Sequence, residues 1–375
     1  MSEDLVIVGG GAIGCAIACE MAGEGWKVRL LDRQKPGAEA SWAAAGMLSP
    51  SAEAAHLPAL VPLSGAALNL YPAFIEELES AAGIRTDFER QGSLVAFFGG
   101  GANHTQGEFL ATLARTGLDG EPLTGEEARR REPGLNPEVA EAVWFAKEAS
   151  VDPRALGRAL RAAAERRGVA IEAGTEVFRV LIERGRCRGV ATAAGEISAA
   201  RVVIAAGCYS AAIEGAARYA QTRPVRGQMA ALDGGAARPR TMIRSERGYL
   251  VPRPDGRVLA GSTLENTGFD KSVTAGGLRK ILNGAAEMVP ALEKAAILET
   301  WAGLRPDSPD HLPILGPTEV ENLSVATGHY RDGILLAPIT ARLARAWLLG
   351  QPADLPIEAF SPLRFLAPKT SSTQA

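Results

Sequence analysis

Cysteine and histidine are scarce in this chain, with four of each among 375 residues. No two cysteines form a C-x-x-C pair. The histidines are scattered, at His56, His104, His311 and His329. A protein metal site needs grouped ligands, so we predict no metal centre. Cys15 and Cys19 lie four residues apart in an apolar segment, where reduced cysteine acts as a small hydrophobic residue.

The sequence also lacks an excess of charge of either sign, because its formal net charge is -3 and its pI is about 6.0. That balance disfavours a nucleic-acid-binding or membrane-surface protein. No apolar run is as long as a transmembrane helix requires, and the acidic start Met1–Asp4 has no signal-peptide pattern. We therefore expect a reduced cytoplasmic protein with no transmembrane segment.

What is present begins with a strand–turn–helix–strand pattern. Leu5–Val8 and Val28–Asp32 are apolar, as in buried parallel strands. Between them, Gly9 to Gly14 fits G-x-G-x-x-G at the start of a helix. Gly9 permits the tight turn, Gly11 lets the backbone approach a diphosphate, and Gly14 lets helix and strand pack closely. The helix N-terminus offers N–H donors to that diphosphate, and Asp32 can bond a ribose hydroxyl. We predict dinucleotide binding, although this motif does not separate FAD from NAD.

The rest of the chain favours FAD, because it leaves the first sheet and returns to it twice. The first return is a three-strand meander over 175–204, and the second is a strand over 323–327. Helices are predicted from Pro153 to Gly168 with Asp152 as N-cap, over 275–288, and from near Gly333 to Leu349. A helix starting near Asp332 would direct its N-terminus at the pyrimidine edge of a flavin.

We predict an α/β fold, in which a glutathione-reductase-like Rossmann FAD-binding domain is interrupted by a substrate-binding domain with a mostly antiparallel β-sheet. The FAD-binding domain comprises residues 1–84, 148–222 and 302–362. The substrate-binding domain comprises residues 85–147 and 223–301, and residues 363–375 form a flexible tail.

Several longer motifs resemble a known family. They are SWAAAGML at 41–48, PVRGQ at 224–228, YLVPR at 249–253, WAGLRP at 301–306 and GHYRDGILLAP at 328–338. From Leu5 to about Gly350, the chain resembles the glycine oxidase branch of the D-amino-acid oxidase superfamily. The resemblance implies that FAD oxidises glycine, sarcosine or a small D-amino acid to the imino acid, with oxygen reduced to hydrogen peroxide. It also implies a role in supplying the glycine imine for the thiazole of thiamine.

The resemblance assigns residues to FAD and to the substrate. Those at the adenosine and diphosphate end are Ala12, Ile13, Asp32, Arg33 and Val177. Those on the loop that passes the ring system are Ala40, Ser41, Ala45, Gly46 and Met47. Those beneath the isoalloxazine are His329, Tyr330, Arg331, Asp332, Gly333, Ile334 and Leu335. Arg305 matches the arginine that pairs with the substrate carboxylate, with Tyr249 and Arg331 nearby.

This assignment agrees with the chemistry, because a guanidinium binds a planar carboxylate bidentately at a fixed angle. Such a pair would orient the α C–H bond toward flavin N5, and orientation is most of what hydride transfer requires. The amine can bind neutral and the imino acid hydrolyses in water, so we nominate no general base. Other interpretations stay open: Arg331 positions the flavin loop, Tyr249 is a core tyrosine, and the ring of His329 is structural.

The chain departs from the family at a few positions. No cysteine lies between Arg305 and Gly316, where some relatives attach flavin, so FAD is expected to be non-covalent. Arg247 and Leu264 stand where family members have histidine and methionine, and both could retune substrate preference.

The alternative function is an amino-acid dehydrogenase with a quinone or a partner subunit as acceptor. A non-enzymatic flavin scaffold and an NAD-dependent dehydrogenase are less favoured. The sequence leaves open the preferred amino acid, the acceptor and whether the chain forms a homo-oligomer.

Overall fold

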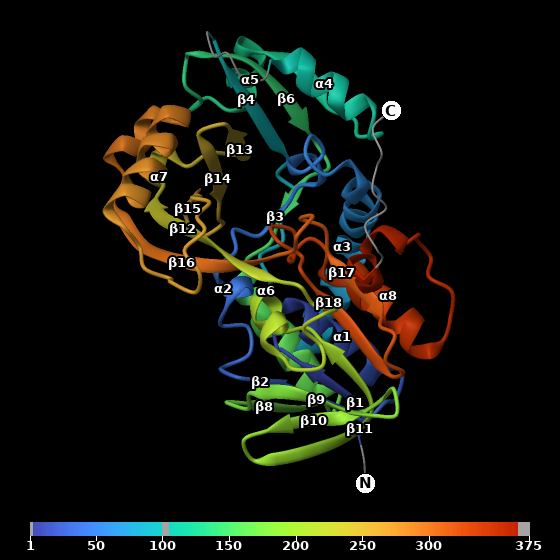
Figure 1. Cartoon of the computed structure of the whole chain (residues 1–375). Coiled ribbons are helices and arrows are strands. Elements are labelled where there is room, and N and C mark those ends of the chain that lie inside the picture. Colours follow the sequence, from blue (N-terminus) through green and yellow to red (C-terminus); the bar gives the residue numbers. More distant parts are fainter. Residues whose placement is uncertain (1–2, 100–104, 367–375) are drawn as a thin grey trace.

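The computed structural model describes residues 3–99 and 105–366, and the strands in these ranges form two eight-stranded sheets and one small ribbon (Figure 1). The first sheet has the order β17-β18-β11-β1-β2-β8, and β10 pairs with β11 and with β9. The pairs from β18 through β8 are parallel, whereas β17 and the β9–β10–β11 extension pair antiparallel. Its strands are β1 (Glu3–Val8), β2 (Val28–Asp32), β8 (Ala170–Ala173), β9 (Val177–Glu183), β10 (Arg186–Thr192), β11 (Gly195–Ile204), β17 (Ile314–Pro317) and β18 (Leu323–Thr327).

The second sheet has the order β16-β12-β15-β14-β13-β4-β6-β5, and every pair in it except β13–β4 is antiparallel. Its strands are β4 (Ser93–Phe98), β5 (Glu121–Thr124), β6 (Val139–Phe145), β12 (Arg223–Asp233), β13 (Met242–Ser245), β14 (Gly248–Pro252), β15 (Arg257–Gly261) and β16 (Ile297–Asp307). The ribbon joins β3 (Met47–Leu48) to β7 (Ala149–Ser150). The predicted fold class is confirmed.

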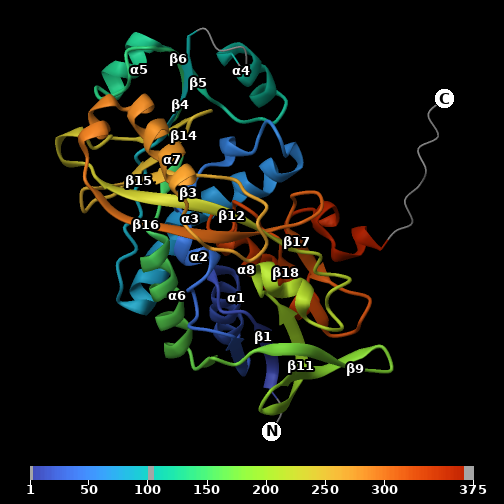
Figure 2. The same ribbon diagram turned by 60° about the vertical axis from the view of Figure 1, so that its left-hand side comes forward.

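The helices in the described ranges are α1 (Ala12–Gly23), α2 (Ala40–Ala43), α3 (Val61–Ala82), α4 (Gln106–Ala114), α5 (Gly125–Arg131), α6 (Pro153–Arg166), α7 (Ala275–Met288) and α8 (Ala337–Leu349). Short 3-10 turns connect them: η1 (Pro50–Ala52), η2 (Pro58–Leu60), η3 (Gly207–Ala212), η4 (Gly235–Ala237), η5 (Pro290–Lys294), η6 (Glu358–Phe360) and η7 (Pro362–Phe365). In Figure 2, α4 and α5 lie at one end of the molecule and the β9–β11 extension at the other.

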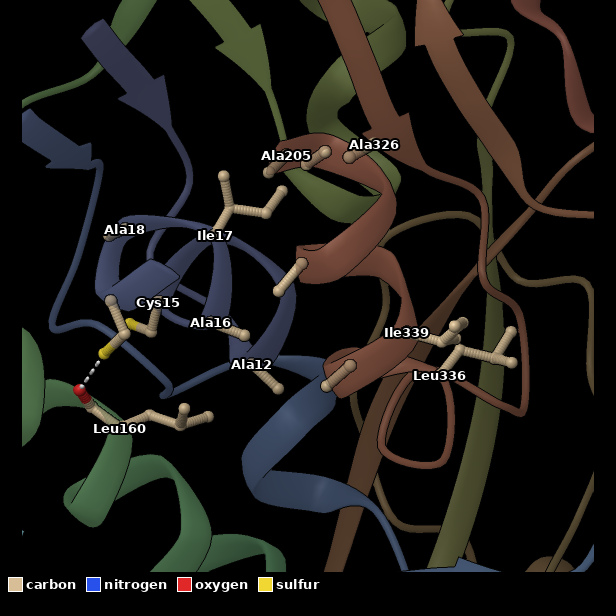
Figure 3. Packing of buried hydrophobic residues seen from close by; sticks show 14 of the residues in the cluster. Ala12, Cys15, Ala16, Ile17, Ala18, Leu160, Ala205, Ala326, Leu336 and Ile339 are labelled. Carbon is tan, nitrogen blue, oxygen red and sulfur yellow. Dashed lines mark hydrogen bonds between the residues drawn. The ribbon is translucent and has the colours of Figure 1, made fainter. Parts of the chain in front are cut away.

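The parallel strands are covered on both faces, which explains their continuous apolar runs. Along β1, Leu5 and Ile7 pack in the core formed with α1, α3, α6 and α8, whereas Val6 and Val8 pack in the opposite core with β9–β11. Helix α1 is apolar except for Glu20 and packs between its neighbours α6 and α8 (Figure 3). The Cys19 thiol donates to the Leu160 carbonyl of α6 at 3.3 Å, so this cysteine is packed as a core residue.

Three predictions about elements need correction. Strand β8 was not predicted, because Ala170–Ala173 is a short, half-exposed edge strand without a long apolar run. The last helix begins at Ala337 and not near Gly333, because Pro338 lacks an N–H and is tolerated only in the first turn. Residues 332–336 instead form a hydrogen-bonded turn, in which the Leu336 N–H donates to the Asp332 carbonyl at 2.8 Å.

The third correction concerns membrane spans. By length and composition, the segment Pro58–Ala82 is apolar enough to cross a membrane, contrary to the expectation from the sequence. One face of α3 packs in the core through Leu63, Ala67 and Tyr71, and the Tyr71 hydroxyl donates to the Ile334 carbonyl at 2.5 Å. The apolar face is therefore used for packing inside this structure.

The predicted domain boundaries remain a prediction, although each sheet draws its strands from separate stretches of the chain. The paired strands β12 and β16 extend between the two halves in Figure 1, from Arg223 opposite Asp307 to Leu232 opposite Ile297. Part of the predicted tail is ordered in η7, where Arg364 pairs with Asp310 at 2.7 Å, and residues 367–375 lie outside the described ranges.

Candidate active site and cofactor cavity

One cavity of about 1110 Å³ runs between the two sheets. It exceeds the roughly 300–1,000 Å³ of ordinary small-ligand pockets, so it can hold a dinucleotide and a small substrate together. Most of the predicted site residues line it: Gly9, Gly11, Ala12, Ile13, Asp32, Arg33, Ala40, Ser41, Ala45, Gly46, Met47, Val177, Tyr249, Arg305, His329, Tyr330, Arg331, Asp332, Gly333 and Ile334. Gly14 and Leu335 do not line it, because Gly14 packs against the Gly9 carbonyl and Leu335 lies in the core.

The nucleotide end is formed where β1 meets α1. Gly9 has φ +109°, and a Cβ there would overlap the Ala205 carbonyl, so only glycine suits this turn. Helix α1 has no side-chain cap and no acidic residue in its first turn. Gly11 provides no cap, the Ala12 N–H donates to Ser41 Oγ at 2.9 Å, and this helix end lines the cavity. This end can therefore receive an anionic diphosphate.

Asp32 is held at the end of β2 by two backbone donors. Its Oδ2 accepts from the Gly10 N–H at 2.7 Å, and its Oδ1 accepts from the Gln34 N–H at 2.8 Å. Burial raises the pKa of Asp32, although both amides act to lower it. Each oxygen keeps a second lone pair, so the carboxylate can still accept from a ribose hydroxyl.

The loop from α2 to β3 is fixed by contacts with the substrate sheet. Trp301 on β16 donates from Nε1 to the Ala43 carbonyl at 3.0 Å. The buried Arg253 donates from Nη2 to the Ala45 carbonyl at 2.5 Å. Gly46 has φ +72°, and a Cβ there would overlap the Val151 carbonyl. The loop backbone therefore follows one path along the cavity.

The segment after β18 carries a histidine that is part of the core. His329 Nε2 lies 3.0 Å from Thr340 Oγ1. Burial lowers the pKa of His329 to about 3, so the ring is neutral at ordinary pH. This environment agrees with the structural interpretation of its ring. Tyr330 has φ +47°, and its N–H donates to the Pro306 carbonyl at 2.9 Å, which ties this segment to β16.

Arg331 has a carboxylate partner that was not predicted. Its Nη2 lies 2.5 Å from Glu53 Oε2, and Glu53 is only 4% exposed. Burial and the nearby Glu53 raise the pKa of Asp332 well above its usual range. Arg244 lies beside this pair, bonded to Ser51 and 3.4 Å from Glu148. Glu53 is the one acidic residue in the Ala-rich stretch from 43 to 55, and an acid in such an apolar stretch was the available signal.

Arg305 differs from the other arginines at this end of the cavity. Its Nη2 donates to Ser262 Oγ at 2.7 Å and its Nη1 donates to the Thr263 carbonyl at 3.2 Å. Among the described residues, Arg305 has no carboxylate within 4.0 Å, whereas Arg331, Arg244 and Arg247 each have one. Its guanidinium rests against Gly227 on β12, where a Cβ would overlap it.

Three more residues singled out in the sequence lie close by. Tyr249 on β14 lines the cavity, and its hydroxyl lies 3.0 Å from Met229 Sδ. Leu264 also lines the cavity and is 60% exposed. Arg247 also lines the cavity, and its guanidinium pairs with Glu287 of α7 and lies over the Phe98 ring at 4.3 Å.

Comparisons with known proteins agree with this geometry. Residues 4–347 match the family described as FAD dependent oxidoreductase. The chain is 36% identical to the bifunctional protein ThiO/ThiG of Trichormus variabilis, over 97% of this chain and 55% of that protein. It is 34% identical to the glycine oxidase of Pseudomonas aeruginosa, over 94% of this chain and 96% of that protein. The structure of glycine oxidase from Geobacillus kaustophilus superposes with a TM-score of 0.90 at 32% identity, covering 97% of this chain and 99% of that one. The chain thus spans about half the length of the bifunctional relatives that it matches.

Proposed function

Since the chain belongs to the FAD-dependent oxidoreductase family, we propose that it is an amino-acid oxidase whose substrates are glycine, sarcosine or small D-amino acids. The products are the imino acid and hydrogen peroxide. Two lines of support are the relatives named glycine oxidase and a cavity with room for a small substrate beside the cofactor.

The observation that carries the proposal is the environment of Arg305. Arg305 lines the cavity, and among the described residues no carboxylate lies within 4.0 Å of its guanidinium, so the carboxylate of a ligand can pair with it. Ser262 and Thr263 accept hydrogen bonds from Arg305 but bring no formal charge. An α-amino acid carries such a carboxylate, and the guanidinium can bind it bidentately.

Each group of residues then has a separate task in the reaction. When bound, FAD supplies the acceptor for the hydride that leaves the α-carbon. Arg305 holds the carboxylate, the Tyr249 hydroxyl adds a donor beside it, and together they fix the angle of the α C–H bond. Arg331 is neutralised by Glu53, so we assign it to positioning the 328–335 segment. His329 is a weak base because burial lowers its pKa to about 3, and its Nε2 is bonded to Thr340, so we assign it no part in proton transfer.

We propose that the cofactor is held without a covalent bond. All four cysteines are buried, and Cys208, the one of them that lines the cavity, lies in η3 beside Tyr209. The uncapped α1 N-terminus receives the diphosphate, Asp32 and Val177 face the adenosine, and the 40–47 loop and the 328–335 segment enclose the ring system.

The oxidase names of the relatives favour oxygen over a quinone or a partner subunit as the electron acceptor. The resemblance to thiamine-biosynthesis glycine oxidases extends the proposal to supplying glycine imine for the thiazole of thiamine. Four free, buried cysteines suit a reducing cytoplasm.

An anaerobic spectral titration of the purified flavoprotein with glycine tests the function. We expect the oxidised flavin absorbance to bleach, and admitting air should restore it with one peroxide per glycine consumed. Bleaching without peroxide would instead support the dehydrogenase.

The variant Arg305→Ala should keep bound FAD and lose bleaching, and Arg305→Lys should recover part of it, because lysine keeps the charge without the fork. Wild-type bleaching in Arg305→Ala would refute the assignment of Arg305. If the wild-type protein does not bleach with glycine, sarcosine and small D-amino acids are tested next.

A further inference from the structure

The segment Ser262–Thr274 connects β15 to α7, and we call it the strap. Five of its residues line the cavity: Ser262, Thr263, Leu264, Phe269 and Lys271. Its first residues hold the substrate arginine, since Ser262 and Thr263 accept from Arg305. Glu265 then forms a pair of backbone hydrogen bonds with Arg226 on β12, at 2.9 and 3.0 Å. The strap therefore begins at the substrate end of the cavity.

Both ends of the strap are pinned to β12. Arg226 is 5% exposed, and its guanidinium pairs with Glu265 at 2.5 Å and with Asp270 at 2.5 Å. The Thr274 N–H donates to the Gln228 side-chain oxygen at 2.8 Å. Arg226 is buried, whereas the Asp270 side chain is 53% exposed, so these pairs fix the strap through one buried guanidinium. The strap is thus held in one place relative to the substrate sheet.

The middle of the strap reaches across to the cofactor half. Phe269 stacks on Tyr209 of η3, with ring centroids 4.9 Å apart and an interplanar angle of 23°. Lys271 Nζ lies 3.1 Å from Glu39 Oε2, just before α2. Arg33 lies over the same Tyr209 ring, with its Cζ 3.6 Å from the centroid. Because Arg33 directly follows Asp32, these contacts lie at the nucleotide end of the cavity.

Phe269, Lys271, Tyr209 and Glu39 all line the cavity that the family's cofactor requires. Phe269 remains 52% exposed although it is stacked. Although Glu39 pairs with Lys271, an aromatic face and an ammonium group that line the cavity suit an adenosine diphosphate moiety, which offers flat rings and negative charge.

We propose that the strap is a further FAD-binding element, contributed by the substrate half of the molecule. Phe269 and Lys271 close the nucleotide end, and FAD leaves only when their contacts with Tyr209 and Glu39 open. This inference rests on the FAD assignment and is independent of which amino acid is oxidised.

The test measures the rate at which FAD leaves the holoenzyme. Wild-type, Phe269→Ala and Lys271→Glu proteins are loaded with FAD and diluted, and the rise in fluorescence of released FAD is followed with time. We expect release about tenfold faster in Phe269→Ala, the scale of one aromatic contact. In Lys271→Glu a carboxylate faces Glu39, and we expect roughly threefold faster release that depends on salt concentration.

The matched control is Val273→Ala, which lies in the same strap, is 37% exposed and does not line the cavity. Its FAD should leave at the wild-type rate. Release at the wild-type rate from both Phe269→Ala and Lys271→Glu would overturn the proposal, and so would equal acceleration in Val273→Ala. Lys271 is on the surface, so its variant decides the question even if Phe269→Ala fails to fold.

Discussion

Adding one methyl group at Gly227 should weaken substrate binding and leave folding nearly unchanged. It lies on β12 opposite Gly303, diagonal to Arg305 on β16. A Cβ at Gly227 would overlap the Arg305 guanidinium. That group is the end of a flexible side chain, so it can swing aside while the two strands stay paired. We therefore expect Gly227→Ala to fold and to bind FAD.

The size of the effect follows from the bonds that are lost. A hydrogen bond to a charged group contributes about 1.5–3 kcal/mol. Losing one of the two bonds between guanidinium and carboxylate should lower kcat/KM for glycine roughly 10- to 150-fold. Most of the loss should be in KM, because the carboxylate is bound in the ground state and the transition state alike. The free energy of unfolding should change by less than about 1 kcal/mol.

Initial rates of peroxide formation over a range of glycine concentrations give kcat and KM, and the flavin absorbance gives the FAD content. Gly276→Ala is the matched control, since a Cβ there meets open space in α7. A wild-type kcat/KM in Gly227→Ala, together with an inactive Arg305→Ala, would refute the packing of Arg305 against Gly227.

Three further predictions concern stability. Tyr71→Phe leaves the Ile334 carbonyl without its donor, so the free energy of unfolding in urea should fall by about 1–3 kcal/mol. A fall no greater than that caused by an exposed Tyr→Phe change would contradict this. Asp152→Ala removes the α6 N-cap acceptor of two first-turn amides and should cost about 1 kcal/mol, whereas Asp152→Asn should keep most of it. Burial lowers the pKa of His329 to about 3, whereas the same ring in the unfolded chain has a pKa of about 6.5. Between these two pH values only the unfolded chain binds a proton at His329. The free energy of unfolding should therefore fall by up to about 1.4 kcal/mol for each pH unit from pH ~6.5 down to pH ~3. His329→Gln, which can still bond Thr340, should flatten that acid limb in urea titrations at several pH values, and an unchanged slope would show that His329 does not cause it.

Much of the fold could be predicted because it depends on neighbouring residues. The alternation of β1 between two cores, the glycine turn before α1, the Asp152 cap and the exact bounds of α7 follow from spacing within a few positions. The edge strand β8 and the true start of α8 were not predicted, because a half-exposed edge has little pattern and a turn resembles the first turn of a helix.

The sequence by itself therefore determined where the glycine turn and its flanking strands and helix lie, and the family motifs predicted Arg305 as the partner of a substrate carboxylate. Only the tertiary structure decided which charges are already matched. Arg331 and Glu53 are 278 positions apart, and no local pattern joins them. The same holds for the strap, where Lys271 meets Glu39 across 232 positions. Such pairs form only after two sheets have packed, because burial, and not sequence distance, selects the partners of a charged group.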